Sequence, residues 1–102
     1  MSRPKYALRL LRAAEDDLVD IVTFVAADNV SAAEALALKI EKSLSSLMNH
    51  PNLGRIPEDA ELTQLGYRYI IVGNYLIFYV VQGKSIVVHR IIHGARDYRS
   101  LL

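Results

Sequence analysis

Cysteine is absent from this chain of 102 residues. Its absence excludes a disulfide framework, a thiol nucleophile and a cysteine-based zinc site, and it fits a reducing compartment. The three histidines, His50, His89 and His93, do not have the spacing of metal ligands. Paired carboxylates placed for a metal and a glycine-rich phosphate loop are also missing from the sequence. We therefore expect no metal site and no cofactor.

Long apolar runs are missing as well. The N-terminal stretch meets a charged residue every few positions, so it lacks the apolar segment of a signal peptide. No segment reaches the roughly 18 to 20 apolar residues that would span a bilayer. The length is that of a single domain, residues 1–102, which can bury a core without covalent staples. The sequence thus predicts one cytoplasmic domain without a membrane association.

Net charge is nearly absent, but the charges are unevenly placed along the chain. The net charge is +1, yet up to Glu61 there are 7 Lys and Arg against 10 Asp and Glu. From Leu62 onward there are 5 Lys and Arg against 1 Asp. An acidic partner should therefore meet the C-terminal half of the chain.

Two segments of the first half have the period of amphipathic helices. The apolar stripe of the first helix comprises Leu18, Ile21, Val22 and Val25. The second helix runs from Ala32 to about Met48, and its stripe comprises Ala33, Leu36, Ala37, Ile40, Leu44 and Leu47. Asn29 or Ser31 can cap the second helix across a short loop. The pattern predicts an antiparallel helical hairpin.

The second half has the composition of strands. Residues 49–68 hold two prolines and two glycines and read as a loop with one short turn. Three segments rich in Tyr, Ile, Val and Phe follow, at residues 67–72, 75–81 and 85–93. A weakly alternating strand at residues 5–11 precedes the helices. These elements predict an α+β fold in the order β-α-α-β-β-β, with the two-helix hairpin packed on an antiparallel sheet.

The three later strands are almost continuously apolar, whereas one helical hairpin covers only one face of a sheet. We therefore expect surplus apolar and aromatic surface, whose natural use is association with a partner.

Four segments, spread over nearly the whole chain, carry a family resemblance. They are AAEDDLVDIVTFVAADN, HPNLGR, YRYIIVGNYLIFYVV and VVHRIIHGARDYRSLL. Their order resembles the RelE/ParE superfamily of type II toxin–antitoxin toxins, and the most specific part is RIIHGARD following YLIFY. The resemblance implies a RelE/ParE-like fold and a cognate antitoxin, ParD-like or of another family, whose C-terminal segment folds on the toxin in a hetero-oligomer.

The superfamily has two main branches with different chemistry. ParE-like members are expected to inhibit DNA gyrase by binding it, whereas RelE-like members cut messenger RNA on the ribosome. The YLIFY strand, the HGARD ending without a dense basic cluster and the total of 12 Lys and Arg favour the ParE-like branch. A ribosome-dependent nuclease and a non-catalytic protein-binding module are the alternatives.

A nuclease of this kind needs a general base, a cation for the phosphorane and an acid for the leaving oxygen. The candidates for these roles are Arg68, Arg90, His93 and Tyr98, with His89 as a further base or acid. Strand alternation points Arg90 to one face and both histidines to the other, unless a bulge intervenes. This geometry counts against a compact site.

A binding toxin needs shape and charge instead. The candidate target-binding residues are Arg55, Arg68, Arg90, His93, Arg96 and Arg99. We predict that the last strand ends near His93 and that a basic arm follows, held to the body by Tyr98, Leu101 and Leu102. The candidate antitoxin-binding residues are Leu18, Val22 and Leu36, on the helical hairpin.

Several of these residues also have a purely structural interpretation. His93 can be a strand-end histidine satisfied by a backbone carbonyl, and Arg90 can pair with Asp97 or with a helix carboxylate. Gly94 can end the strand by a conformation that a side chain would forbid. Tyr69, Tyr75 and Tyr79 are expected at the edge of the core.

Overall fold

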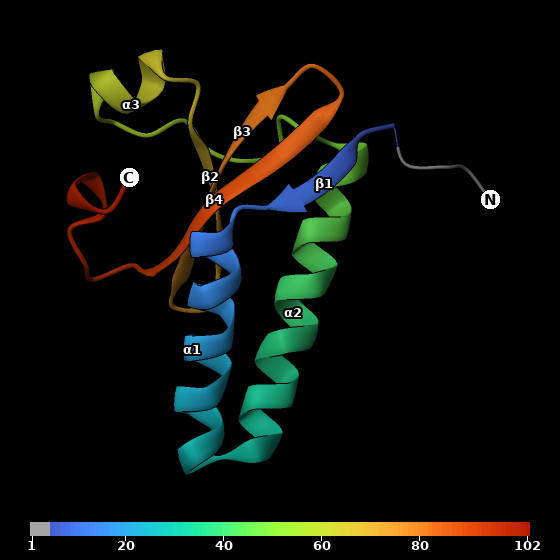
Figure 1. The fold of residues 1–102 in the computed structure, drawn as a ribbon, viewed down its shortest axis with the longest axis vertical. Coiled ribbons are helices and arrows are strands. Elements are labelled where there is room, and N and C mark those ends of the chain that lie inside the picture. Colours follow the sequence, from blue (N-terminus) through green and yellow to red (C-terminus); the bar gives the residue numbers. More distant parts are fainter. Residues whose placement is uncertain (1–4) are drawn as a thin grey trace.

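The computed structural model describes residues 5–102, which form an α+β fold around one four-stranded sheet (Figure 1). The elements in chain order are β1 (Ala7–Leu10), α1 (Arg12–Asp28), α2 (Val30–Asn49), α3 (Ala60–Gln64), β2 (Arg68–Val72), β3 (Tyr75–Gln82), β4 (Ser85–His93) and the 3-10 helix η1 (Tyr98–Ser100). The predicted fold class is confirmed, and α3 is the short turn expected within the long loop. The first four residues of the predicted domain lie outside the described part.

The sheet has the strand order β1-β4-β3-β2. Strands β2, β3 and β4 form the predicted antiparallel meander, with Gly73 and Gly83 at positive φ in its two turns. The first strand adds in parallel to β4, with Ala7 opposite Ser85, so the sheet is mixed instead of purely antiparallel. A parallel pair requires a long crossover connection, and the helical hairpin begins that connection directly after β1. None of the helices of residues 5–102 has both the length and the apolar character needed to cross a membrane.

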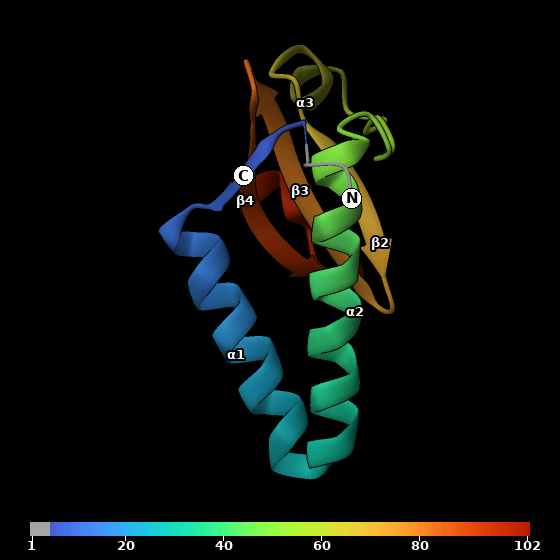
Figure 2. The same ribbon diagram turned by 90° about the vertical axis from the view of Figure 1, so that its right-hand side faces the viewer.

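The helices α1 and α2 form an antiparallel hairpin that extends away from the sheet (Figure 2). Of the two predicted caps, Asn29 is the one used, because its side chain accepts a hydrogen bond of 3.0 Å from the Ala32 amide. The hairpin and one sheet face bury the larger core cluster, which includes Ile40, Leu44, Leu47, Ile77, Tyr79, Val88 and Ile91. Tyr79 is fully buried, so its predicted place at the core edge is wrong.

The opposite face of the sheet has no long helix, yet the chain covers it. Leu62 of α3 packs there, together with Tyr98, Leu101 and Leu102 from the C-terminus, against a second buried cluster around Phe78. The surplus apolar surface predicted from the strands is therefore largely buried by other segments of the same chain. Large apolar side chains that remain exposed on the hairpin are Val19, Phe24, Val30 and Leu38.

A β-bulge interrupts β4. Phe78 lies opposite Arg90 and Tyr79 lies opposite Val88, so His89 is the extra residue. The bulge changes the alternation: His89 contacts Tyr67 in the second cluster instead of pointing with His93 to the helix side. The predicted shared face of the two histidines is therefore wrong, and a local irregularity of this kind has no signal in strand periodicity.

Gly94 follows β4 in a backbone conformation that other residues also adopt. The described glycines with positive φ are Gly66, Gly73 and Gly83. The prediction that Gly94 uses a forbidden conformation is therefore wrong. Its amide donates to the Asn74 carbonyl at 2.8 Å, and a Cβ at this position would lie 3.4 Å from the same oxygen.

Candidate functional site

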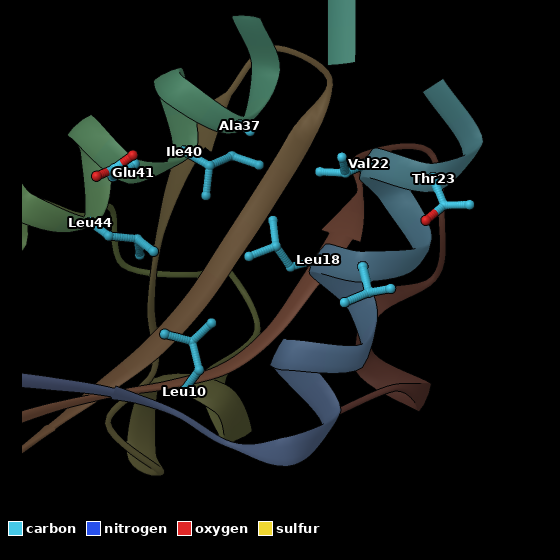
Figure 3. Close-up of a pocket in the computed structure, with 9 residues that line it drawn as sticks. Leu10, Leu18, Val22, Thr23, Ala37, Ile40, Glu41 and Leu44 are labelled. Carbon is cyan, nitrogen blue, oxygen red and sulfur yellow. The ribbon is translucent and has the colours of Figure 1, made fainter. Parts of the chain in front are cut away.

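An apolar groove of about 570 Å³ lies between the two long helices (Figure 3). It is lined by Leu10, Leu18, Val19, Val22, Thr23, Ala37, Ile40, Glu41 and Leu44. Figure 3 shows Leu18 and Val22 of α1 directed toward Ile40 and Leu44 of α2, with Leu10 of β1 below them. Val19, on the groove wall, is 63% exposed. Seven of the nine lining residues are hydrophobic, so the groove offers an occupant apolar contact.

The structure brings together two of the three residues predicted to bind an antitoxin. Leu18 and Val22 line the groove, whereas Leu36 packs against the larger core cluster. Leu36 is on the predicted apolar stripe of its helix, but it does not line the groove. Periodicity identifies an apolar face without dividing it between core and groove.

Arg90 forms a two-point ion pair with Asp17 of α1. Its Nε donates to Asp17 Oδ2 at 2.7 Å and its Nη2 donates to Asp17 Oδ1 at 2.8 Å. Both side chains are largely buried, with 24% and 15% of their surface exposed. The hydrogen bonds that Arg90 donates to the Asp17 carboxylate hold the pKa of Arg90 above its ordinary value, so the guanidinium stays charged. The predicted pairing with a helix carboxylate is confirmed, and Asp97 is not the partner.

His89 and Tyr67 form a second polar pair on the sheet face away from the hairpin. The Tyr67 hydroxyl lies 3.0 Å from His89 Nδ1, and the two rings meet edge to face. Burial is the main cause that lowers the pKa of His89, and the nearby charge of Arg9 lowers it further. Burial also raises the pKa of Tyr67. The pair is therefore neutral near pH 7 and is half-buried in the second cluster.

His93 ends β4 in an exposed position. Its Nδ1 accepts a hydrogen bond of 3.1 Å from the Ala95 amide, and its ring meets Tyr75 edge to face. This is the structural role considered from the sequence, except that the backbone partner is an amide instead of a carbonyl. His93 and Arg90 line the same small hollow of about 150 Å³ at the edge of β4, together with Asp17 and Asp20. Arg96 lines the hollow as well, so its two carboxylates balance its two guanidinium groups and leave no excess positive charge for a phosphate.

Arg55 belongs to the loop that precedes β2, and Arg68 is the first residue of β2. Arg68 Nη1 donates to the Gly54 carbonyl at 3.0 Å, and the backbone of Arg55 pairs with Tyr69 as an extra bridge on the sheet edge. The Arg55 side chain is exposed. Arg68 therefore holds the loop in place, and Arg55 extends from it into solvent.

The buried Tyr79 also holds this loop in place. Its hydroxyl donates to the Pro51 carbonyl at 2.8 Å and accepts from the Gly54 amide at 2.9 Å. A Cβ on Gly54 would lie 2.6 Å from that hydroxyl oxygen, so only glycine fits here. Pro51 and Gly54 thus shape the turn through contacts with a buried tyrosine that the sequence did not indicate.

The four candidate nuclease residues do not form one cluster. Arg68 lies opposite Tyr79, whose ring is on the helix side of the sheet, whereas Tyr98 stacks on Phe78 on the other side. Arg90 and His93 lie at the edge of β4, and the Arg90 guanidinium is engaged by Asp17. No group of three or more potential metal ligands occurs within residues 5–102. The arrangement offers no assembled acid, base and phosphate cation.

The C-terminal arm, residues 94–102, presents the remaining basic candidates. Tyr98 packs on Phe78 with ring centroids 5.0 Å apart, and Leu101 and Leu102 contact the same second cluster. Arg99 lies 3.4 Å from Asp59, the capping residue of α3, and 3.8 Å from Asp97. The arginines Arg96 and Arg99 are both exposed. The strand end at His93 and the anchored basic arm therefore match the prediction.

Asp17 is the main residue that sequence reasoning missed. A signal was present, because Asp17 stands three residues after the buried Ala14 and four before Ile21, on the inward face of α1. An acidic residue among inward-facing apolar residues indicates a buried partner of opposite charge.

Comparison with known proteins gives two positive findings. A family model described as the ParE toxin of the type II toxin–antitoxin system parDE matches residues 8–98. Among solved structures, a chain of the chromosomal ParDE toxin–antitoxin system from P. aeruginosa is similar with a TM-score of 0.70 and 22% sequence identity. That match covers 89% of this chain and 98% of the other. A search of curated proteins found no match.

Proposed function

Since this chain belongs to the ParE toxin family of type II toxin–antitoxin systems, we propose that it arrests growth by binding DNA gyrase and not by cutting RNA. The observation that supports a binding mechanism is the dispersal of Arg68, Arg90, His93 and Tyr98 over both faces and the edge of the sheet. General acid–base catalysis requires the participating groups within hydrogen-bond reach of one substrate position.

The proposed target-binding surface is the C-terminal arm with Arg96 and Arg99, with Arg55 as a further exposed cation. Arg68 and Arg90 were candidates for this surface, but their guanidinium groups are engaged by loop carbonyls and by Asp17. We therefore assign these two a supporting role. A gyrase target would place the action in the cytoplasm, and a single domain, residues 1–102, suffices for it.

The proposed partner is a cognate antitoxin whose C-terminal segment folds into the groove between α1 and α2. The solved relative is part of a ParDE toxin–antitoxin system. The groove is wide, apolar and open at Val19, which suits an amphipathic segment that buries its apolar side chains as it folds. Leu18 and Val22 remain the central contacts of this proposal.

The decisive experiment compares two activities of the purified protein. We expect inhibition of gyrase supercoiling, and we expect ribosome-bound message to remain intact in a primer-extension assay. The double variant Arg96→Ala/Arg99→Ala should inhibit gyrase more weakly, since it removes the exposed charges of the arm. Codon-dependent cuts in translated message, with supercoiling unaffected, would transfer the assignment to the RelE-like nuclease.

A further inference from the structure

The guanidinium of Arg90 joins three separate parts of the chain. Two of its nitrogens, Nε and Nη2, bind the carboxylate of Asp17 on α1. Its third nitrogen, Nη1, donates to the main-chain carbonyl of Leu101 at 3.0 Å. Arg90 itself belongs to the meander. One planar group on β4 thus bridges the first long helix and the C-terminal arm.

The open edge of β4 explains why this bridge exists. Strand β1 ends at Leu10, opposite Val88, so the last part of β4 lacks a neighbouring strand on that side. Asp17 fills the gap: besides binding Arg90, its Oδ2 accepts a hydrogen bond of 2.9 Å from the Ile91 amide. Three hydrogen bonds to one carboxylate fix α1 against the strand and fix the plane of the guanidinium.

A fixed guanidinium plane determines where Nη1 points. With Nε and Nη2 held by Asp17, the fork geometry of arginine directs Nη1 to the Leu101 carbonyl. Leu101 also closes the turn of η1, because its amide and that of Leu102 both donate to the Tyr98 carbonyl. The position of the arm therefore depends on the orientation that Asp17 gives to Arg90.

We propose that Arg90 is a positioning residue that couples α1, a wall of the groove, to the C-terminal arm. Asp17 directly precedes Leu18, which lines the groove. A groove occupant that displaces α1 would displace Asp17, reorient Arg90 and release the Leu101 carbonyl. This coupling rests on the proposed function for the identity of groove and arm ligands, whereas the bridge itself is a property of the isolated chain.

The test measures amide hydrogen exchange in the purified full-length protein. The variant Asp17→Asn removes the charge that orients Arg90, and the hydrogen bonds of Asp17 go to Arg90 and to the Ile91 amide instead of to the arm. Its matched control is Asp20→Asn, which removes the same charge one turn later on α1, at a residue that lines the same hollow. A second variant, Arg90→Lys, keeps the positive charge but cannot bind Asp17 at two points and Leu101 at the same time.

We expect the amides of Leu101 and Leu102 to exchange about tenfold faster in Asp17→Asn than in the wild type, since charged hydrogen bonds are lost. In Asp20→Asn their exchange should stay within about twofold. If Asp17→Asn instead accelerates amide exchange throughout the sheet, Arg90→Lys becomes the deciding variant. In Arg90→Lys, amide exchange should become faster in the arm while the amides of β3 stay protected. Arm exchange equal to the control in both Asp17→Asn and Arg90→Lys would overturn the coupling.

The readout separates this inference from the proposed function. Exchange in the arm is measured without gyrase or antitoxin, so a failure of gyrase inhibition leaves the result intact. Conversely, suppose that the protein inhibits gyrase but that amide exchange in the arm is the same with and without the Asp17 charge. That result would support the proposed function and reject the coupling.

Discussion

The groove and the C-terminal arm are built in opposite ways. The groove is formed by two long helices and a strand, and its walls are almost entirely apolar. The arm is a short segment with one 3-10 turn, and it carries two exposed arginines on a few apolar anchors. Apolar burial contributes mainly to affinity, whereas exposed charge contributes mainly to the association rate and to specificity. Under the proposed function, the difference predicts a tightly held antitoxin at the groove and a rapidly found target at the arm.

The sequence predicts the residues of each surface but not the contact that connects the two surfaces. The helical periodicity reveals the apolar residues of the groove, and the charge distribution reveals the basic arm. Their connection through Asp17 and Arg90 depends on residues 73 positions apart. The following predictions test whether the surfaces behave as differently as their construction implies.

The largest effect is expected at the groove. The substitution Val22→Glu places a carboxylate among apolar walls, where an occupant would have to desolvate it. We expect binding of the cognate antitoxin, measured by calorimetry, to weaken about 100-fold or more. The control is Leu38→Glu, an equally polar change at a residue of α2 that is 63% exposed and does not line the groove. Equal binding by the two variants would show that the antitoxin does not use the groove.

At the arm we expect a smaller effect with a different signature. The double variant Arg96→Ala/Arg99→Ala should slow association with gyrase roughly tenfold at low salt. The difference should shrink above physiological ionic strength, because the Debye length there falls below about 8 Å. Its control, Arg12→Ala/Lys39→Ala, removes two exposed positive charges from the helices instead. A control that slows association just as much would assign the effect to net charge and not to the arm.

A change in the shared scaffold should affect both surfaces together. Tyr79→Phe removes the hydroxyl that binds Pro51 and Gly54, and leaves two buried backbone groups without that partner. We expect the free energy of unfolding to fall by about 1 to 3 kcal/mol, measured by denaturant titration. Tyr69→Phe is a suitable control, since this ring is only partly buried at the edge of the second cluster. A loss of binding that is confined to the groove or to the arm would contradict a common scaffold.

The smallest effect is a pH dependence on the arm side of the sheet. Burial depresses the pKa of His89 below the ordinary value of 6.5, so the unfolded chain binds its proton more readily. The stability due to neutral His89 is present above pH 6.5 and is lost as the pH falls toward the folded pKa. Asp59 also has a lowered pKa, but its contribution is lost only below 3.8.

The measurement is thermal unfolding between pH 7.5 and about pH 5. The decrease in Tm over this window should become smaller in His89→Gln than in the wild type. An unchanged decrease in the variant would mean that His89 does not limit stability in this range.

The elements of the fold were predictable because each has a local signal. Apolar periodicity predicted both helices, Asn29 was one of the two caps considered between them, and composition predicted the three strands of the meander. The parallel pairing of β1 with β4 had no such signal, because it joins residue 7 to residue 85. Strand pairing over this distance depends on the whole topology.

The candidate site was predictable only in part, for the same reason. The exposed cations Arg96 and Arg99 and the apolar Leu18 and Val22 are recognisable from composition and period. The engagement of Arg90 by Asp17 and the displacement of His89 by a bulge depend on tertiary contacts and on local register. The sequence therefore offered Arg90 both as a ligand-binding cation and as the partner of a helix carboxylate, and the tertiary structure identifies Asp17 as that partner.

The parallel pairing of β1 with β4 has a consequence for how the protein is made. During synthesis the helical hairpin emerges early, whereas β4, the strand that pairs with β1 and carries Arg90, is the last strand to emerge and is followed by the arm. Domains generally fold as units, and contacts distant in sequence form late. A nascent chain therefore displays the walls of the groove well before its sheet and arm can close. An antitoxin that recognises those walls could meet the toxin while it is still on the ribosome, before the part proposed to act on gyrase is complete.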